Sequence, residues 1–149
     1  MKMPASIQHR FAIARKMRAA NRLLDLKYVN QDHKTTHLQE ALHCIRMVVE
    51  TGEKNEEVLR DYRISLGTDA AALEEEAVAF ETKQNLSLND ADHIRYKRSA
   101  LILECRTLAH FLVITLLNYI VDPNDEVREI FEKYSQSLSK THFKLSEIL

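Results

Sequence analysis

Glycine, proline and tryptophan are scarce in this chain. It holds two glycines, two prolines and no tryptophan among 149 residues, whereas average usage is about 7% glycine and about 5% proline. Glycine and proline mark most turns, so their scarcity argues against a fold of many short segments. The regular alternation of apolar and polar residues that indicates strands is also missing. The sequence therefore predicts an all-α fold: a single-domain bundle, residues 1–149, of about five to six helices.

Cysteine is also scarce. The two cysteines, Cys44 and Cys105, stand alone, without the paired spacing of a redox or zinc motif. Isolated cysteines beside apolar residues are typical of core positions in a reducing compartment. The first residues of the sequence lack the apolar stretch of a secretory signal peptide. We therefore expect a cytoplasmic protein.

Residues 99–121 form the most apolar stretch of the chain, SALILECRTLAHFLVITLLNYIV. A helix that spans a bilayer needs about 20 predominantly apolar residues, but Glu104, Arg106 and His110 interrupt this one. Because charges near the centre of a span are costly, we expect no membrane insertion. The stretch instead predicts a long, buried fifth helix at the centre of the bundle. Along it, five residues are expected to be nearly inaccessible: Leu101, Leu108, Leu112, Leu116 and Ile120.

The remaining helices follow from apolar spacing and from capping residues. Residues 5–28 predict the first helix, and Asn30 or Asp32 is expected to begin a second that ends before Gly52. Gly67 is expected to separate a third helix, residues 54–65, from a fourth, residues 69–83. Further caps are expected before the two last helices, at Ser87 or Asn89 and at Asp122 or Asn124.

The charge is unevenly distributed, although the net charge is only −1. Residues 1–29 hold seven basic residues and one acidic residue, a charge of +6. Residues 50–92 hold four basic and twelve acidic residues, a charge of −8. The simplest use of this asymmetry is internal, with the basic helix beside the acidic one, but it also suits an external partner of either sign.

Three arginines of the first helix share one face. Arg15, Arg18 and Arg22 are three and four residues apart, opposite the apolar face of the same helix. Such a stripe suits contacts with nucleic-acid phosphates, or it is a solvated face. The nucleic-acid hypothesis predicts that the stripe is exposed and continuous with three further basic residues, Arg95, Lys97 and Arg98.

One flank of the second helix carries residues that could bind a metal ion. The candidate ligands are His33, His37, Glu40 and Cys44, each separated from the next by one helical turn. Zinc takes nitrogen, oxygen and sulfur ligands of this kind in tetrahedral geometry. No His-Glu-x-x-His motif is present, and the Glu-x-x-His pair of di-metal bundles occurs once rather than twice. The alternative is a polar helix flank without metal.

Arg106 and His110 lie one turn apart in the apolar helix. An Arg/His pair in a helical bundle of this length is similar to that of the HEPN-type ribonucleases. The motif of that family separates the two residues further than in this chain, where both side chains fall on one helix face. The resemblance implies an RNA-cleaving site at these two residues.

Three classes of function follow. The first is a non-enzymatic protein-interaction module (an adaptor, chaperone, inhibitor or small regulatory protein) that acts through a helix face, as a homodimer or with another protein. The second is a nucleic-acid-associated regulator that uses the first helix. The third is a metal-binding or HEPN-like helical bundle. The first needs no special residues and is preferred; it implies no cofactor and no catalytic residue.

Overall fold

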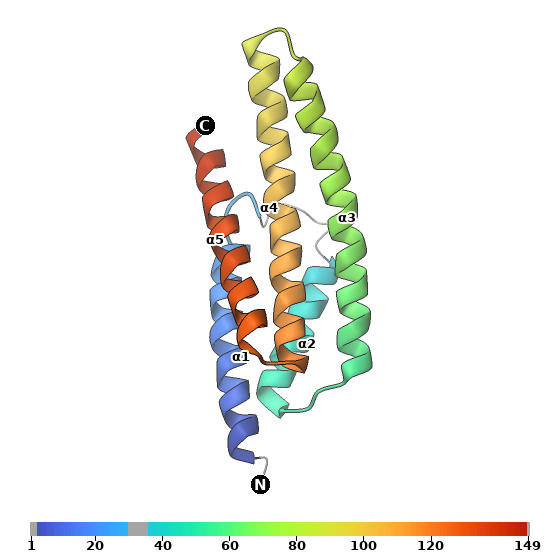
Figure 1. Cartoon of the computed structure of the whole chain (residues 1–149), viewed down its shortest axis with the longest axis vertical. Coiled ribbons are helices and arrows are strands. Elements are labelled where there is room, and N and C mark those ends of the chain that lie inside the picture. The colour runs from blue at the N-terminus through green and yellow to red at the C-terminus, as the bar shows by residue number, and fades with distance from the viewer. Residues whose placement is uncertain (1–2, 30–35, 149) are drawn as a thin grey trace.

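The computed structural model describes residues 3–29 and 36–148, and within them the chain forms five helices and no strand (Figure 1). The helices are α1 (Met3–Leu24), α2 (Thr36–Thr51), α3 (Glu56–Leu86), α4 (Asp90–Val121) and α5 (Asp125–Ile148). The prediction of an all-α bundle is confirmed.

Helix α4 is the centre of the molecule. It contacts the other four helices, with α3 and α5 on its two sides and α1 and α2 behind it in the view of Figure 1. Its buried residues run from Ala100 to Ile120. The prediction of a central, largely buried apolar helix is therefore confirmed, although this helix is the fourth in the chain and not the fifth.

The difference in numbering arises at Gly67, where the expected helix end is wrong. Helix α3 continues through Gly67 without interruption. A glycine inside a helix costs about 1 kcal/mol relative to alanine, and burial of the neighbouring Leu66 and Ala70 against the bundle outweighs that cost. The Thr68 hydroxyl, directly after the glycine, donates to the Ile64 carbonyl at 3.0 Å.

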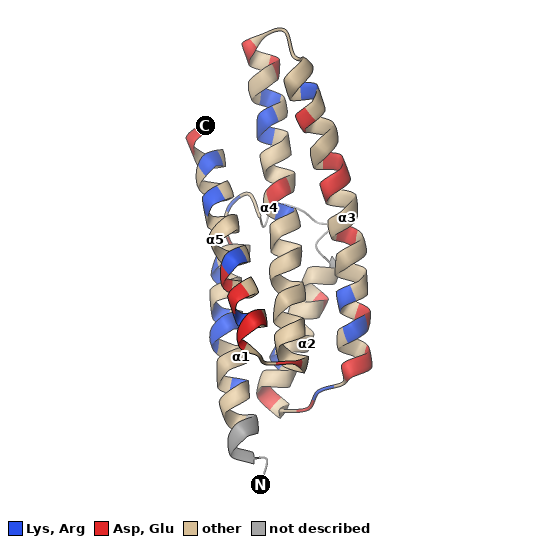
Figure 2. Ribbon diagram, in the orientation of Figure 1, with Lys and Arg blue, Asp and Glu red and all other residues tan. Residues whose placement is uncertain are grey.

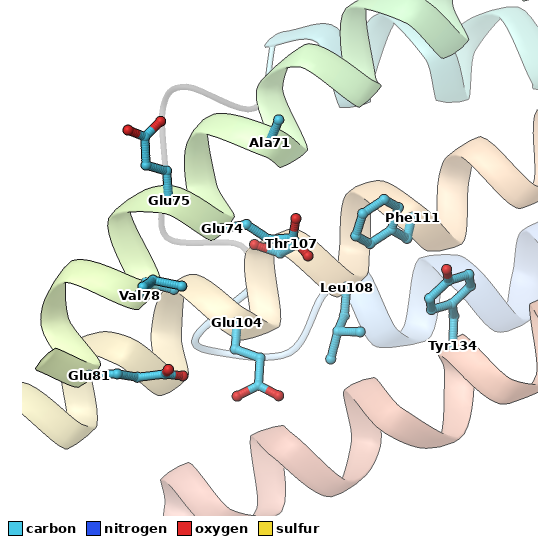
Figure 3. A pocket seen from close by; sticks show the side chains of 11 residues that line it. Ala71, Glu74, Glu75, Val78, Glu81, Glu104, Thr107, Leu108, Phe111 and Tyr134 are labelled. Atoms are coloured by element: carbon cyan, nitrogen blue, oxygen red, sulfur yellow. The ribbon is translucent and has the colours of Figure 1, made fainter.

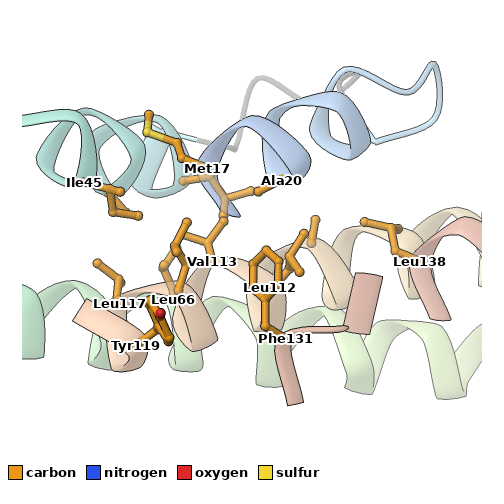
Figure 4. Packing of buried hydrophobic residues seen from close by; sticks show 14 of the residues in the cluster. Met17, Ala20, Ile45, Leu66, Leu112, Val113, Leu117, Tyr119, Phe131 and Leu138 are labelled. Carbon is orange, nitrogen blue, oxygen red and sulfur yellow. The ribbon is translucent and has the colours of Figure 1, made fainter. Parts of the chain in front are cut away.

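The core is formed where the other four helices meet α4 (Figure 4). Three of the residues expected to be inaccessible, Leu112, Leu116 and Ile120, have no exposed surface. The expectation is wrong for Leu101 and Leu108, which are half-buried. Leu108 lies on a side of α4 that faces an open groove, described below, so no helix covers it completely.

Asparagine side chains cap three helices. The Asn55 carboxamide accepts from the Val58 amide, and Asn89 and Asn124 make the equivalent bonds at the starts of α4 and α5. The expected caps at Asn89 and Asn124 are thus confirmed. The expected start of the second helix, Asn30 or Asp32, lies outside the described residues.

By length and composition alone, α4 could cross a membrane, but its most apolar window is 61% buried inside the bundle. Its polar residues there are hydrogen-bonded. The Thr115 hydroxyl donates to the Phe111 carbonyl at 2.8 Å, and Asn118 accepts from the Arg63 guanidinium at 2.8 Å. The second of these bonds joins α4 to α3, so Asn118 is satisfied by another helix of the bundle.

The far end of the α3–α4 hairpin projects beyond the other helices (Figure 1). Buried residues end at Ala77 in α3 and begin again at Ala100 in α4. Between them, the rings of Phe80 and Tyr96 lie 6.2 Å apart, with the Lys83 ammonium over both. Among the described residues, no third helix covers this end of the hairpin (Figure 1).

Candidate functional site

A groove of about 670 Å³ runs along α4 between α3 and α5 (Figure 3). Helices α3 and α5 both contact α4 but, within the described residues, not each other, so this side of α4 stays open. Most of the lining comes from α3 and α4, and α5 contributes Tyr134. The α3 side is formed by Ala71, Glu74, Glu75, Ala77, Val78 and Glu81, and the α4 side by Glu104, Thr107, Leu108 and Phe111.

The exposed edge of α3 beside the groove has a regular spacing. Six residues recur at intervals of three and four, and we call them the α3 seam: Ile64, Gly67, Ala71, Glu74, Val78 and Glu81. The Ile64 and Val78 side chains are 60% and 58% exposed. A β-carbon added at Gly67 would meet nothing within 4 Å, so there is open space beside it. This alternation of spacings is the one by which a helix presents a continuous stripe to a second helix.

The two ends of the groove differ in polarity. At one end, the rings of Phe111 and Tyr134 stack 5.5 Å apart, with small Ala71 on the opposite side. At the other end lie the carboxylates of Glu81 and Glu104 (Figure 3). The groove is thus apolar at one end and acidic at the other.

Helices α1 and α3 carry opposite charges. Helix α1 has five basic and no acidic residues, a charge of +5, whereas α3 has three basic and eight acidic residues, a charge of −5 (Figure 2). Helix α1 contacts α2, α4 and α5, but α1 and α3 do not touch within the described residues. The expectation that the basic first helix pairs internally with the acidic segment is therefore wrong for these two helices. Arg10 and Lys16 make contacts within the chain, so the charges available to partners are the three exposed arginines of α1 and the exposed glutamates of α3.

The exposed face of α1 is apolar at its start and basic further on. We call its five residues the α1 stripe: Ile7, Phe11, Arg15, Arg18 and Arg22, all exposed. Ile7 is 41% exposed and Phe11 is 62% exposed. Lys16 does not belong to the stripe. Its ammonium lies 4.6 Å from the centre of the Tyr119 ring, and burial lowers its pKa.

One of the three basic residues expected on α4 lies beside the segment that follows α1. The Arg98 guanidinium lies 5.9 Å from the centre of the Tyr28 ring, which follows the end of α1. Arg95 instead bonds to its neighbours in α4, Asp92 and Tyr96. The stripe of arginines is exposed as the nucleic-acid hypothesis requires, and the binding itself stays a prediction.

The candidate metal ligands are not gathered around one point in the described part of the chain. The His37 Nδ1 atom lies 2.6 Å from Asp69 of α3, and this hydrogen bond raises the pKa of the imidazole. Glu40 is exposed and Cys44 is half-buried. His33 lies outside the described residues, and among the others no three His, Cys, Asp or Glu side chains form a metal-binding group. The metal site stays a prediction.

The Arg106 and His110 pair lies on the inner side of α4. The His110 ring is 3% exposed, and its Nδ1 atom donates to the Arg106 carbonyl at 2.7 Å. A buried imidazole bonded to the backbone of its own helix is suited to packing. The HEPN-like ribonuclease stays a prediction that these contacts do not support.

The sequence interpretation missed the groove, because it considered the acidic residues of positions 50–92 only as partners of the basic first helix or of an external molecule. The spacing of the α3 seam was a usable signal, but the expected break at Gly67 concealed its first half. No protein-family model matches the chain, and no curated protein and no solved structure is similar to it.

Proposed function

We propose that this protein is a non-enzymatic protein-binding module whose groove between α3 and α5 holds an amphipathic helix of a partner. The observation that supports the proposal most directly is the open side of the central helix, where Leu108 and Phe111 line a groove with helices along both sides. An apolar groove bounded by helices is a common receptor for an amphipathic helix. The partner would occupy the place of a missing bundle helix.

The α3 seam determines what kind of helix fits. Gly67 and Ala71 are small and allow close approach of another backbone. Glu74 and Glu81 are seven residues apart on the same face, which is about 10.5 Å along a helix. A matching helix therefore carries two lysines or arginines seven residues apart beside an apolar stripe. A second copy of α3 would bring like charges together and is disfavoured.

A designed peptide tests the proposal. The peptide is a labelled amphipathic helix with an apolar stripe and two lysines seven residues apart, and the matched control has glutamates at those two positions. We expect fluorescence anisotropy to show saturable binding of the lysine peptide and at least about tenfold weaker binding of the control. Addition of salt weakens the binding of the lysine peptide because it screens these charges.

Two variants locate the binding surface. Glu81→Lys places a positive charge in the groove and is expected to weaken binding of the lysine peptide. Glu76→Lys makes the same change on an exposed residue of α3 that does not line the groove, and it is expected to leave binding close to wild type. Equal effects of the two substitutions, or no binding of either peptide, would refute the proposal.

The exposed arginines favour one further candidate, a nucleic-acid-associated regulator that uses α1. Arg15, Arg18 and Arg22 would contact phosphates, and the affinity would fall steeply with salt. This candidate is tested by titrating a labelled duplex or single-stranded oligonucleotide into the protein. Binding that is lost in Arg15→Glu/Arg22→Glu and unchanged in Glu81→Lys would support it.

A further inference from the structure

We infer that the helix bound in the groove is α1 of a second copy of this chain, so that the protein assembles head to tail. The inference rests on the proposed function, because it names the partner of the same groove. Its starting point is the opposite charge of α1 and α3, +5 and −5, because these two helices do not contact each other within the described residues of one chain.

The polarity of the two surfaces fixes the direction of the bound helix. The α1 stripe begins with Ile7 and Phe11 and continues with three arginines. The groove has its apolar end at Phe111 and Tyr134 and its acidic end at Glu81 and Glu104 (Figure 3). When α1 of the second copy runs parallel to α3, its apolar residues contact the apolar end of the groove and its arginines contact the acidic end.

The spacing of the charged residues agrees with that direction. Arg15 and Arg22 are seven residues apart, as are Glu74 and Glu81. With Arg15 opposite Glu74, Arg22 falls opposite Glu81. Phe11, one turn before Arg15, then lies beside small Ala71 and near the open space at Gly67. A large side chain is thus paired with small ones, as packed helices require.

The two surfaces lie on different helices of the chain, so this contact is heterologous. Each copy in a dimer would keep one free groove or one free α1 stripe. Growth beyond the dimer is therefore expected unless the geometry closes a ring. An isologous dimer would stop at two copies.

The experiment measures the mass of the full chain in solution by sedimentation velocity, at micromolar to millimolar concentrations and at low and high salt. We expect wild type to grow with concentration and to dissociate at high salt. Arg15→Glu/Arg22→Glu and Glu74→Lys/Glu81→Lys should each stay monomeric. Lys140→Glu/Lys144→Glu, with the same change in net charge as the arginine variant, should associate as wild type does. Circular dichroism verifies folding, and the milder glutamine substitutions at the same positions replace any variant that fails to fold.

Mixing the two monomeric variants gives the sharpest result. Glu74→Lys/Glu81→Lys keeps an intact α1 stripe, and Arg15→Glu/Arg22→Glu keeps an intact groove. We expect the mixture to regain association that grows with concentration, because the unchanged stripe of one variant matches the unchanged groove of the other, and the two charge-reversed surfaces also carry opposite charges. A mixture that stays monomeric would overturn the inference.

Other outcomes would also overturn it, and they separate it from the proposed function. If wild type stays monomeric while the designed lysine peptide binds, the groove is confirmed as a receptor and the second copy is excluded as its ligand. Association that persists in both charge-reversed variants would place the contact elsewhere. A monomer that binds an oligonucleotide through Arg15 and Arg22 would assign the α1 stripe to nucleic acid. If neither the peptide nor a second copy binds, both proposals are wrong.

Discussion

The Arg10 guanidinium of α1 donates through Nε to the Val49 carbonyl oxygen in the last turn of α2, at 2.9 Å. Its Nη2 atom donates to the next carbonyl, that of Glu50, at 2.6 Å. The last carbonyls of a helix lack partners within the helix, and a cation near them also offsets the negative end of the helix dipole. Gly52, with φ of +74°, turns the chain away directly after this cap.

Arg10→Ala should therefore destabilise the protein by about 1–2 kcal/mol, because two carbonyls lose a charged donor. The measurement is the free energy of unfolding in urea. Arg46→Ala, an exposed arginine of α2, serves as the control and is expected to change stability by less than about 0.5 kcal/mol. An equal effect of both substitutions would show that the cap contributes nothing specific.

Leu116→Ala should cost about 2–5 kcal/mol, because this fully buried side chain leaves a cavity when truncated. Leu101→Ala removes the same atoms from a half-buried site of the same helix. Part of the Leu101 side chain already contacts solvent, so its truncation removes fewer packing contacts. Its cost should be clearly smaller. Urea unfolding of the two variants checks the order, and a larger loss at Leu101 would contradict the described packing of α4.

The pair formed by His37 and Asp69 should make stability depend on pH. The hydrogen bond to Asp69 raises the pKa of His37 in the folded state, so protonation favours folding. The resulting stabilisation is fully present below the unfolded pKa, about 6.5, and is lost as the pH rises through the higher folded value. The free-energy difference between wild type and His37→Gln should thus be larger at about pH 5.5 than at about pH 8.5.

Nuclear magnetic resonance gives a direct check of that pair. The imidazole of His37 should titrate above its ordinary pKa in wild type, and its midpoint should fall in Asp69→Asn. A midpoint for His37 that is unchanged by Asp69→Asn would show that the pair does not form in solution.

The two thiols should react at different rates. Cys105 is fully buried, and burial raises its pKa to about 12, whereas Cys44 is half-buried with a pKa raised by a smaller desolvation. The thiolate is the reactive form. A chromogenic disulfide reagent should modify Cys44 slowly and leave Cys105 unmodified in the native protein, and should modify both after denaturation. Rapid native labelling of the Cys44→Ser variant would contradict the described burial of Cys105.

Patterns along the sequence predicted the parts of the fold that depend on local chemistry. The apolar run identified α4, and Asn89 and Asn124 were recognised as caps because an asparagine side chain satisfies nearby amides. Gly67 was misinterpreted because a glycine permits a helix end without requiring one. Only the packing of Leu66 and Ala70 against neighbouring helices determines that α3 continues.

The candidate site depended on contacts that no local pattern contains. The spacing of Arg15, Arg18 and Arg22 placed them on the face opposite the apolar one and left open what that face meets, because nothing in the sequence places α1 away from α3. The groove exists because α3 and α5 pack against α4 on either side of one open face and do not contact each other within the described residues. The bonds of Arg10 to α2 join residues about 40 positions apart, a distance over which apolar spacing carries no information.

His9, the residue before Arg10, connects α1 to the end of α4. The His9 Nε2 atom donates to the Ile120 carbonyl at 3.0 Å, across 111 positions of the chain. Contacts between α3 and α4 are close in sequence and form at a small entropic cost, whereas this one must wait until most of the chain is ordered. The α3–α4 hairpin is therefore expected to organise the folding transition state, with α1 docking late. Folding kinetics of Leu66→Ala and Met17→Ala would test this order. We expect a high φ value, the share of the lost stability that appears in the folding rate, for Leu66 in the hairpin and a low φ value for Met17 in α1.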